Sequence, residues 1–325
     1  MTILKRRGVI AGALGLPSLL ARPALANGFP GRPVRIVVPF PPGGATDGAA
    51  RVVAEFLAQR YGTPVIVENR PGASGAIGGE AVARSAPDGL TWLIASAYPL
   101  ATGPLLNTRM PYDPGRDLTP VSMVFTTDHV ITVNSSMQAR SLAEFIPEAR
   151  ARRQPVRYGS PGIGTGSHLM GELLQMKTGA ELVHIPYRGL AAAVTDQLAG
   201  TIEMMIDQIP TSLPHIRAGK VRALAVTGTR RHPTLPEVPT ATELLPGYEA
   251  QSWNAIAVNG ATPPALVERI SADIRAALAD PATQARLAPL GADYAGSTPA
   301  EMAAVLRAEV ERWEPVIRTA GITMQ

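Results

Sequence analysis

Two joints between a β-type run and a helix start constrain this chain more than any other feature. In the first, VRIVVPFPPGGATDGAAR (residues 34–51), an apolar run passes through a Pro-Pro-Gly-Gly turn directly into a helical pattern. In the second, VRYGSPGIGTGSHL (residues 156–169), another β run passes through glycines to a polar helix start. The first turn of a helix has unpaired backbone N–H groups and the positive end of the helix dipole, so each joint predicts an anion site. Two such joints in two halves of one chain predict a ligand held between two lobes.

Outside these joints, β-type runs alternate with helical patterns along both halves of the chain. The first half has β runs at 34–40, 64–67 and 91–95, with helical patterns at 46–61 and 76–85. The second half has β runs at 156–160, 182–186, 202–206 and 221–226, separated by helical patterns at 165–177, 190–199 and 211–218. Such alternation is typical of doubly wound parallel sheets. We therefore predict an α/β fold with one mostly parallel sheet in each lobe.

Two β-rich segments lie between these halves and predict a hinge. Residues 120–134 lead into the second half, and residues 247–259 lead back to two amphipathic helical patterns at 264–279 and 299–319. If the chain crosses at about Asp128 and returns at about Tyr248, the segments form a two-strand hinge. The predicted domains are residues 27–127 plus 248–325 for one lobe and 128–247 for the other. The C-terminal helices are then expected to pack on the first lobe.

The first 26 residues have the pattern of a secretory signal peptide. Lys5-Arg6-Arg7 precedes an apolar run from 8 to 20, and Ala24-Leu25-Ala26 is a small-x-small cleavage site. The run is shorter than the ~20 residues that span a bilayer, and it includes Pro17, which argues against an uncleaved anchor. The arginine pair permits twin-arginine export as well as the general secretory route. We predict cleavage after Ala26 and a periplasmic product.

Composition excludes several classes of function. The whole chain has a formal net charge of +4, but without the four basic residues of the leader 26 Lys and Arg oppose 26 Asp and Glu. A neutral exported protein whose basic clusters, at 150–153 and 230–231, lack interleaved aromatics is not expected to bind nucleic acid. The sequence has no cysteine, which excludes disulfides and thiol catalysis, and its five histidines include no H-x-x-x-H pair. We expect no metal and no cofactor.

The candidate site residues follow from the position of ligands in open parallel sheets, which is beyond the carboxyl ends of the strands. Applied to the predicted strands, this rule selects the two glycine loops and single residues after three other strands. These residues are Phe40, Pro42, Gly43, Gly44, Thr46, Asp47, Ser74, Ser96, Ser160, Gly164, Thr165, His168 and Asp207.

The chemistry of the two loops favours a carboxylate ligand. Neither residues 39–47 nor residues 159–168 contain Lys or Arg, so backbone dipoles and the hydroxyls of Ser160 and Thr165 would have to neutralise the anion. The second loop lacks the G-x-G-x-x-G spacing, because Ser167 occupies the place of the last glycine, and no lysine follows as in a P-loop. Dinucleotide and ATP binding are therefore disfavoured. Asp47 is expected to cap its helix, since a carboxylate beside an anion repels it.

A hydrolase is the catalytic alternative, with Ser160 or Ser167, His168 and Asp207 as a triad. The chain contains no G-x-S-x-G elbow, and Ser167 and His168 are neighbours on a helix start, where adjacent side chains do not face each other. We therefore expect a binding protein rather than an enzyme.

Ordered segments along nearly the whole mature chain resemble the Bug/TctC family of extracytoplasmic solute receptors, which are associated with tripartite tricarboxylate transporters. The segments are VPFPPGGATDGAAR, ENRPGASGAIGGEAVARSAPDG, MPYDPGRDLTPV, YGSPGIGTGSHLMGELLQMKTG, HIPYRG, IEMMID, LPHIRAGKVRALAVT and LPEVPTATE.

The resemblance implies a two-lobed periplasmic binding protein fold of type II that closes over a small organic acid. It implies that the loops at 41–47 and 159–168 hold one ligand carboxylate, often through ordered waters, and that membrane transporter subunits are partners. We expect a monomer. Di- and tricarboxylates, amino acids and aromatic acids all remain candidate ligands, and a sensory role that presents the ligand to another protein remains open beside transport.

Overall fold

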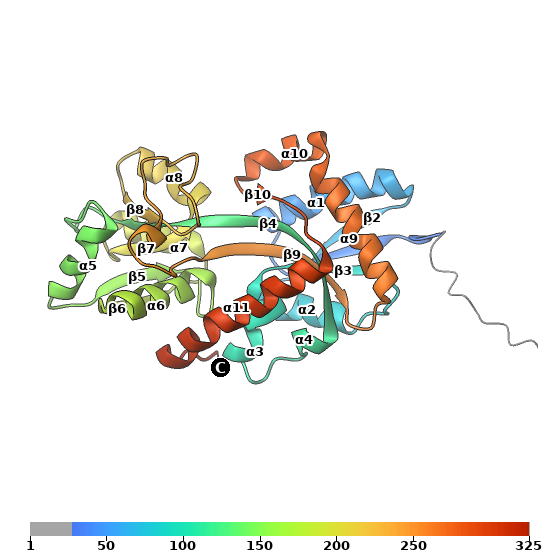
Figure 1. The fold of residues 1–325 in the computed structure, drawn as a ribbon, viewed down its shortest axis with the longest axis horizontal. Coiled ribbons are helices and arrows are strands. Elements are labelled where there is room, and N and C mark those ends of the chain that lie inside the picture. The colour runs from blue at the N-terminus through green and yellow to red at the C-terminus, as the bar shows by residue number, and fades with distance from the viewer. Residues whose placement is uncertain (1–27, 325) are drawn as a thin grey trace, which may run out of the picture.

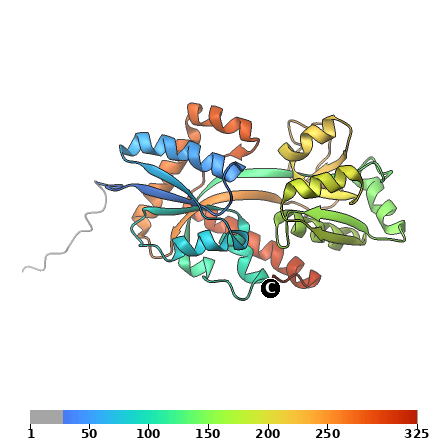
Figure 2. The ribbon, with the colours of Figure 1, turned by 180° about the vertical axis from the view of Figure 1, so that it is seen from behind.

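Two long strands, β4 (Leu118–Val133) and β9 (Gln251–Asn259), run through both lobes of the computed structural model, which describes residues 28–324 (Figure 1). Figure 2 shows the same two strands side by side from the opposite direction. They pair in antiparallel register from Leu118 with Asn259 to Asp128 with Gln251. From His129 onward, β4 pairs instead with β7 (Met204–Gln208) and β8 (Arg222–Val226). We propose that the lobes divide near Asp128 and Tyr248, into residues 27–127 plus 248–325 and residues 128–247.

The remaining elements are given in chain order. Before β4 the chain forms β1 (Val34–Val38), α1 (Ala45–Tyr61), β2 (Val65–Asn69), η1 (Ala73–Gly75), α2 (Ala76–Ala83), β3 (Thr91–Ala95), η2 (Tyr98–Thr102), α3 (Gly103–Leu106) and α4 (Pro114–Asp117). Between β4 and β9 it forms α5 (Leu142–Ala151), β5 (Val156–Ser160), α6 (Gly166–Thr178), β6 (Leu182–Pro186), α7 (Leu190–Ala199), β7, α8 (Ile209–Arg217), β8 and η3 (Ala241–Glu243). After β9 it forms α9 (Pro264–Ala279), α10 (Pro281–Leu287), η4 (Ala288–Leu290), β10 (Asp293–Tyr294) and α11 (Pro299–Ala320).

The strands form one mixed sheet in the order β2-β1-β3-β9-β4-β7-β5-β6, with β8 and β10 also paired to β4. The prediction of parallel strands holds for β1, β2 and β3, and again for β5, β6 and β7. The two hinge strands differ, because β9 is antiparallel to both β3 and β4. The physical reason is that the chain crosses between the lobes once in each direction, so the crossing strands must oppose each other.

Packing of α1 on the sheet fixes the first helix start. Ala49, Val53 and Leu57 repeat at i, i+4 and i+8 and are buried against the β1 side chains Val34 and Ile36. The strand ends at Val38, directly before Pro39 and earlier than the predicted residue 40, and the helix begins one residue earlier than predicted, at Ala45. The start of α1 therefore lies just beyond the carboxyl end of β1, the edge where a ligand is expected.

The last helix, α11, differs most from the expectation that the C-terminal helices pack on the first lobe. It is a 22-residue helix with a capping box formed by Thr298 and Glu301. Its residues contact η2 and α3 of the first lobe and also α6 of the second, and Figure 1 shows it lying across the hinge strands. Trp313, buried on α11, belongs to a core cluster that includes residues of both lobes. The helix therefore bridges the lobes.

Other differences from prediction are small. The strand expected at 202–206 lies at Met204–Gln208, and the following helix begins at Ile209 with Pro210 in its first turn, a favourable position for proline. The sequence reading missed α5, α10 and η2. Within residues 28–324, no helix is both long and apolar enough to span a membrane. The predicted signal peptide, residues 1–26, lies outside the described residues.

Candidate ligand-binding site

The loop before α1 is held by a buried carboxylate. Asp47 is only 4% exposed, and its Oδ2 accepts hydrogen bonds from the Gly43 N–H (3.0 Å) and Arg51 Nε (3.0 Å). Its Oδ1 accepts from Arg51 Nη2 (2.9 Å) and Asn69 Nδ2 (2.9 Å). Burial opposes ionisation, but the hydrogen bonds from Arg51, Gly43 and Asn69 outweigh it and lower the pKa of Asp47. Asp47 thus shapes the loop, with both oxygens already occupied.

The first turn of α1 keeps its backbone donors free. Gly44, the residue before the helix, is extended and has no side chain to cap it, and Gly48 is the first residue whose N–H bonds back to the chain, at Gly44 O. Among the described residues, no acceptor bonds to the N–H groups of Ala45, Thr46 or Asp47. Phe40 and Pro42 flank this turn, and Phe40 O accepts from Asn69. The start of α1 is therefore uncapped and has free backbone donors of the kind that bind anions in proteins.

The loop before α6 is closed by its own hydroxyls. Ser160 Oγ donates to Gly162 O (2.9 Å) and accepts from the Gly162 N–H (3.1 Å). Thr165 Oγ1 donates to the same carbonyl (2.8 Å). Ser160 is fully enclosed, with 0% exposure. The two hydroxyls expected to donate to a ligand are therefore used within the loop, where they fix its shape.

The start of α6 repeats the arrangement at α1. Thr165 precedes the helix in an extended conformation without a side-chain cap, and Leu169 is the first residue whose N–H bonds back, at Thr165 O. In the described chain, the N–H groups of Gly166, Ser167 and His168 bond to no other group. Gly164 has φ +74°, a left-handed conformation that favours glycine, and its N–H donates to His168 Nδ1 (3.0 Å).

Two stacked histidines contact this second loop at Ser160 and Gly164. The rings of His168 and His184 lie 3.7 Å apart at 13°, and His184 Nε2 lies 2.6 Å from Ser160 Oγ. Burial lowers the pKa of His168 to about 4 and, together with His168, that of His184 to about 3. Both rings are therefore neutral at pH 7. Neutrality matters, because His168 Nδ1 can accept from Gly164 only when it carries no proton. The sequence reading missed His184.

The depressed histidine pKa values predict a loss of stability in mild acid. The unfolded chain binds a proton at His184 below about its ordinary value of 6.5, while the folded chain binds it only near 3. The free energy of unfolding should therefore fall as the pH falls through this window. Asp207 acts in the opposite sense, because its pKa is raised to about 7. Urea unfolding of His184→Phe and of wild type at pH 7 and pH 5 separates the contributions of His184 and Asp207. Between pH 7 and pH 5 the variant should lose less free energy of unfolding than wild type. Equal losses in the two proteins would contradict the role of His184.

The remaining predicted residues lie after three other strands. Asp207, at the end of β7, is 2% exposed; its Oδ2 has no hydrogen-bond partner among the described residues, and burial raises its pKa to about 7. Ser74 is exposed in the loop after β2 with φ +54°, an uncommon conformation for a non-glycine residue. Ser96 is half-buried directly after β3. Asp207 is thus a carboxyl group that exchanges its proton near neutral pH.

A catalytic triad finds no support in this geometry. Of the predicted triad, Ser160 contacts His184 rather than His168, and its hydroxyl is fully enclosed. Within residues 28–324, no hydrogen bond joins Asp207 to either His168 or His184. Two arginines in loops after strands are not buried in this region: Arg70 pairs with Glu68, and Arg188 is exposed.

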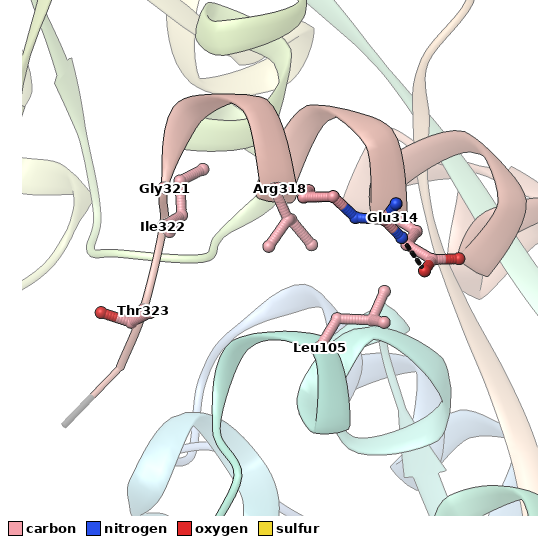
Figure 3. A pocket seen from close by; sticks show the side chains of 7 residues that line it. Leu105, Glu314, Arg318, Gly321, Ile322 and Thr323 are labelled. Atoms are coloured by element: carbon pink, nitrogen blue, oxygen red, sulfur yellow. Dashed lines mark hydrogen bonds and ion pairs between the residues drawn. The ribbon is translucent and has the colours of Figure 1, made fainter.

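A cavity of about 360 Å³ lies between the end of α11 and α3. It is lined by Leu105, Glu314, Ile317, Arg318, Gly321, Ile322 and Thr323. Figure 3 shows Leu105 facing α11 and the ion pair between Arg318 and Glu314 beside it. No predicted site residue lines this cavity.

Comparison with known proteins decides the family. Residues 49–322 match the model of the tripartite tricarboxylate transporter family receptor, TctC. The chain belongs to this family. The protein BugT of Bordetella pertussis is 39% identical over 308 residues, which cover 94% of each chain. The predicted resemblance is thus confirmed, and the protein is a solute-binding receptor of a periplasmic family.

Solved structures of relatives confirm the two-lobed periplasmic binding protein fold. The R. palustris protein Rpa4515 with adipate has a TM-score of 0.79 and 37% identity, covering 91% of this chain and 99% of that one. MatC from Rhodopseudomonas palustris with bound malate has a TM-score of 0.74 and 30% identity, covering 89% of this chain and 100% of that one. These family members and structural neighbours are binding proteins, and both ligands are small carboxylates.

Proposed function

We propose that this receptor captures a small organic carboxylate between the starts of α1 and α6. One observation carries the proposal: both helices begin without a cap, and each leaves three backbone N–H groups without an acceptor in the described chain. Six donors and two helix dipoles favour a negative charge. Neither loop contains Lys or Arg, which suits a carboxylate better than a phosphate.

Other predicted residues have supporting roles in this proposal. Gly43, Gly44 and Gly164 allow close approach of the backbone, while Asp47, Ser160, Thr165 and His168 hold the loops in shape. Ser74 and Ser96 supply hydroxyls from the first lobe. Asp207 is protonated to a large extent near pH 7, so its carboxyl group can donate to a ligand oxygen. Adipate and malate in two relatives support the same class of ligand.

We further propose that the mature receptor acts in the periplasm, after removal of residues 1–26, as a monomer that delivers its ligand to a tripartite tricarboxylate-type transporter. The family match supports this assignment. A sensory receptor would use the same site with a different partner. The identity of the membrane protein that co-purifies with the receptor, a transporter or a sensor, separates these two roles.

A thermal melt against a panel of ligands tests the proposed function. At a concentration ~100 times its dissociation constant, a ligand that binds only the folded state adds roughly 2.7 kcal/mol to the free energy of unfolding. We expect at least one mono-, di- or tricarboxylate of the panel to raise the melting temperature accordingly. A shift with inorganic phosphate or a sugar, and none with any carboxylate, would contradict the assignment.

A further inference from the structure

Two polar side chains on one face of β9 lie beside the two uncapped helix starts. Thr46 Oγ1 donates to Asn254 Oδ1 (3.1 Å), which places this amide at the start of α1. Ser252 Oγ lies 3.2 Å from the position of a Cβ built on Gly166, the first residue of α6. Residues two apart on a strand point to the same face, about 7 Å from each other along the strand. One short stretch of β9 therefore contacts both helix starts.

The side-chain amide nitrogen of Asn254 is free to donate hydrogen bonds. The side chain is only 7% exposed, yet its Nδ2 bonds to no acceptor among residues 28–324. Because Thr46 occupies Oδ1, Nδ2 is the atom left to interact, and it carries two N–H donors. Nδ2 is not one of the fully enclosed unpaired side-chain atoms of the described residues, so it is not sealed off from a ligand. The start of α1 holds three more unpaired donors next to it. A group with several lone pairs would satisfy them together, and a carboxylate has about four acceptor sites.

We propose that Asn254 is a ligand-binding residue that determines specificity: its amide nitrogen donates to the ligand oxygens bound at the start of α1. This inference rests on the proposed carboxylate function. Donors from the strand and from the helix meet at one point, where they stabilise a carboxylate and oppose an ammonium group. We do not assign the same role to Ser252, because its hydroxyl already has a partner, His129 Nε2, at 3.3 Å.

Two substitutions of similar size test this role, with a control on the opposite face of the same strand. Asn254→Leu removes the two N–H donors of the amide. Asn254→Asp replaces them by a carboxylate, which can itself accept hydrogen bonds from the free N–H groups at the start of α1. Gln251→Leu is the control, because Gln251 donates to Asp128 Oδ1 (2.5 Å) and its position alternates with Ser252 and Asn254. Calorimetry measures binding of acetate, malonate, succinate, glutarate, adipate and malate, and melts report the stability of each ligand-free variant.

We expect Asn254→Leu to weaken binding of the tightest of these carboxylates ten- to a hundredfold, the range for a hydrogen bond to a charged group. Asn254→Asp should weaken it more, while its ligand-free melting temperature stays at or above that of Asn254→Leu, because a carboxylate stabilises a helix start. Gln251→Leu should keep affinity within threefold of wild type. Wild-type affinity in both Asn254 variants would overturn the inference and leave the proposed function intact. Failure of the wild-type protein to bind any of the six, together with no shift by any carboxylate in the melting panel, would overturn both.

Discussion

Gly43→Val is expected to lower carboxylate affinity at least a hundredfold. Gly43 has φ +92°, a conformation that a β-branched side chain tolerates poorly. Its N–H donates to Asp47, so a change in its backbone moves the loop before α1. A Cβ built there meets no atom within 4 Å, which means that the valine would project beside the free donors of the helix start rather than into the core. Calorimetry with the best carboxylate of the panel measures the loss.

The control for this variant is Gly219→Val. It places a valine at another glycine with positive φ, outside the proposed ligand site. Gly219 has φ +66°, and a Cβ there also meets nothing within 4 Å. It follows α8, far along the chain from either loop. Both variants should lose about 1 to 2 kcal/mol of stability from the left-handed backbone. Only Gly43→Val should lose binding, and equal affinities in the two variants would place the ligand elsewhere.

Gly164→Val is the counterpart at the second loop, but its effect is less specific. A Cβ on Gly164 would lie 2.8 Å from Leu106 Cδ1 and 3.2 Å from Met324 Sδ. The valine would therefore disturb packing between α3, the C-terminal segment and the loop, in addition to straining φ. We expect loss of both stability and binding, which makes Gly43→Val the cleaner test.

Asp47→Ala is expected to cost about 2 to 4 kcal/mol in the free energy of unfolding. The substitution removes the acceptor of four hydrogen bonds, from Gly43, Asn69 and twice from Arg51. Arg51 is half exposed and can return to water, so the cost stays below that of a fully buried ion pair. Binding should weaken as well, since Gly43 loses its anchor. Urea unfolding and calorimetry measure the two effects.

Glu55→Ala is the matched control on the same helix. Glu55 forms an ion pair with Arg286, but both side chains are about half exposed, and such surface pairs contribute little. We expect unfolding and binding of Glu55→Ala to match wild type closely. A loss of stability in Asp47→Ala no greater than in Glu55→Ala would contradict the role given to the buried carboxylate.

The sequence predicts the α/β alternation, the family and the two helix starts because these depend on local patterns. Glycine loops without basic residues point to both proposed anion sites, and the apolar period of α1 predicts the face that it buries. The opposed directions of the hinge strands follow from the predicted outward and return crossings, but their residue register does not, since it depends on how two distant segments pair. The bridging position of α11 likewise depends on contacts between the lobes.

The polar side chains that complete the site depend on tertiary contacts and were partly missed. His184 and Asn69 reach the loops from neighbouring strands, so no spacing in the sequence connects them to the residues they contact. Asn254 could have been found, because polar residues at 252 and 254 alternate with apolar ones in QSWNAIAVN, as expected where one face of a strand is not covered by core. The sequence predicts Ser160 and Thr165 as ligand donors. Their hydrogen bonds to Gly162 O depend on the folded shape of the loop, which the sequence does not show.

The uncapped helix starts also bear on how this protein should be engineered. A serine or aspartate before a helix typically stabilises it by about 1 kcal/mol over alanine and by a few tenths of a kcal/mol over glycine. Gly44 has no side chain to cap α1, and the Thr165 hydroxyl bonds to Gly162 O instead of capping α6, so a routine search for stabilising substitutions would consider both positions. A cap placed at Gly44 would compete with the ligand for the same N–H groups. Design of a thermostable biosensor should therefore leave both positions unchanged, while graded caps at Gly44 offer a way to shift the concentration range that such a sensor reports.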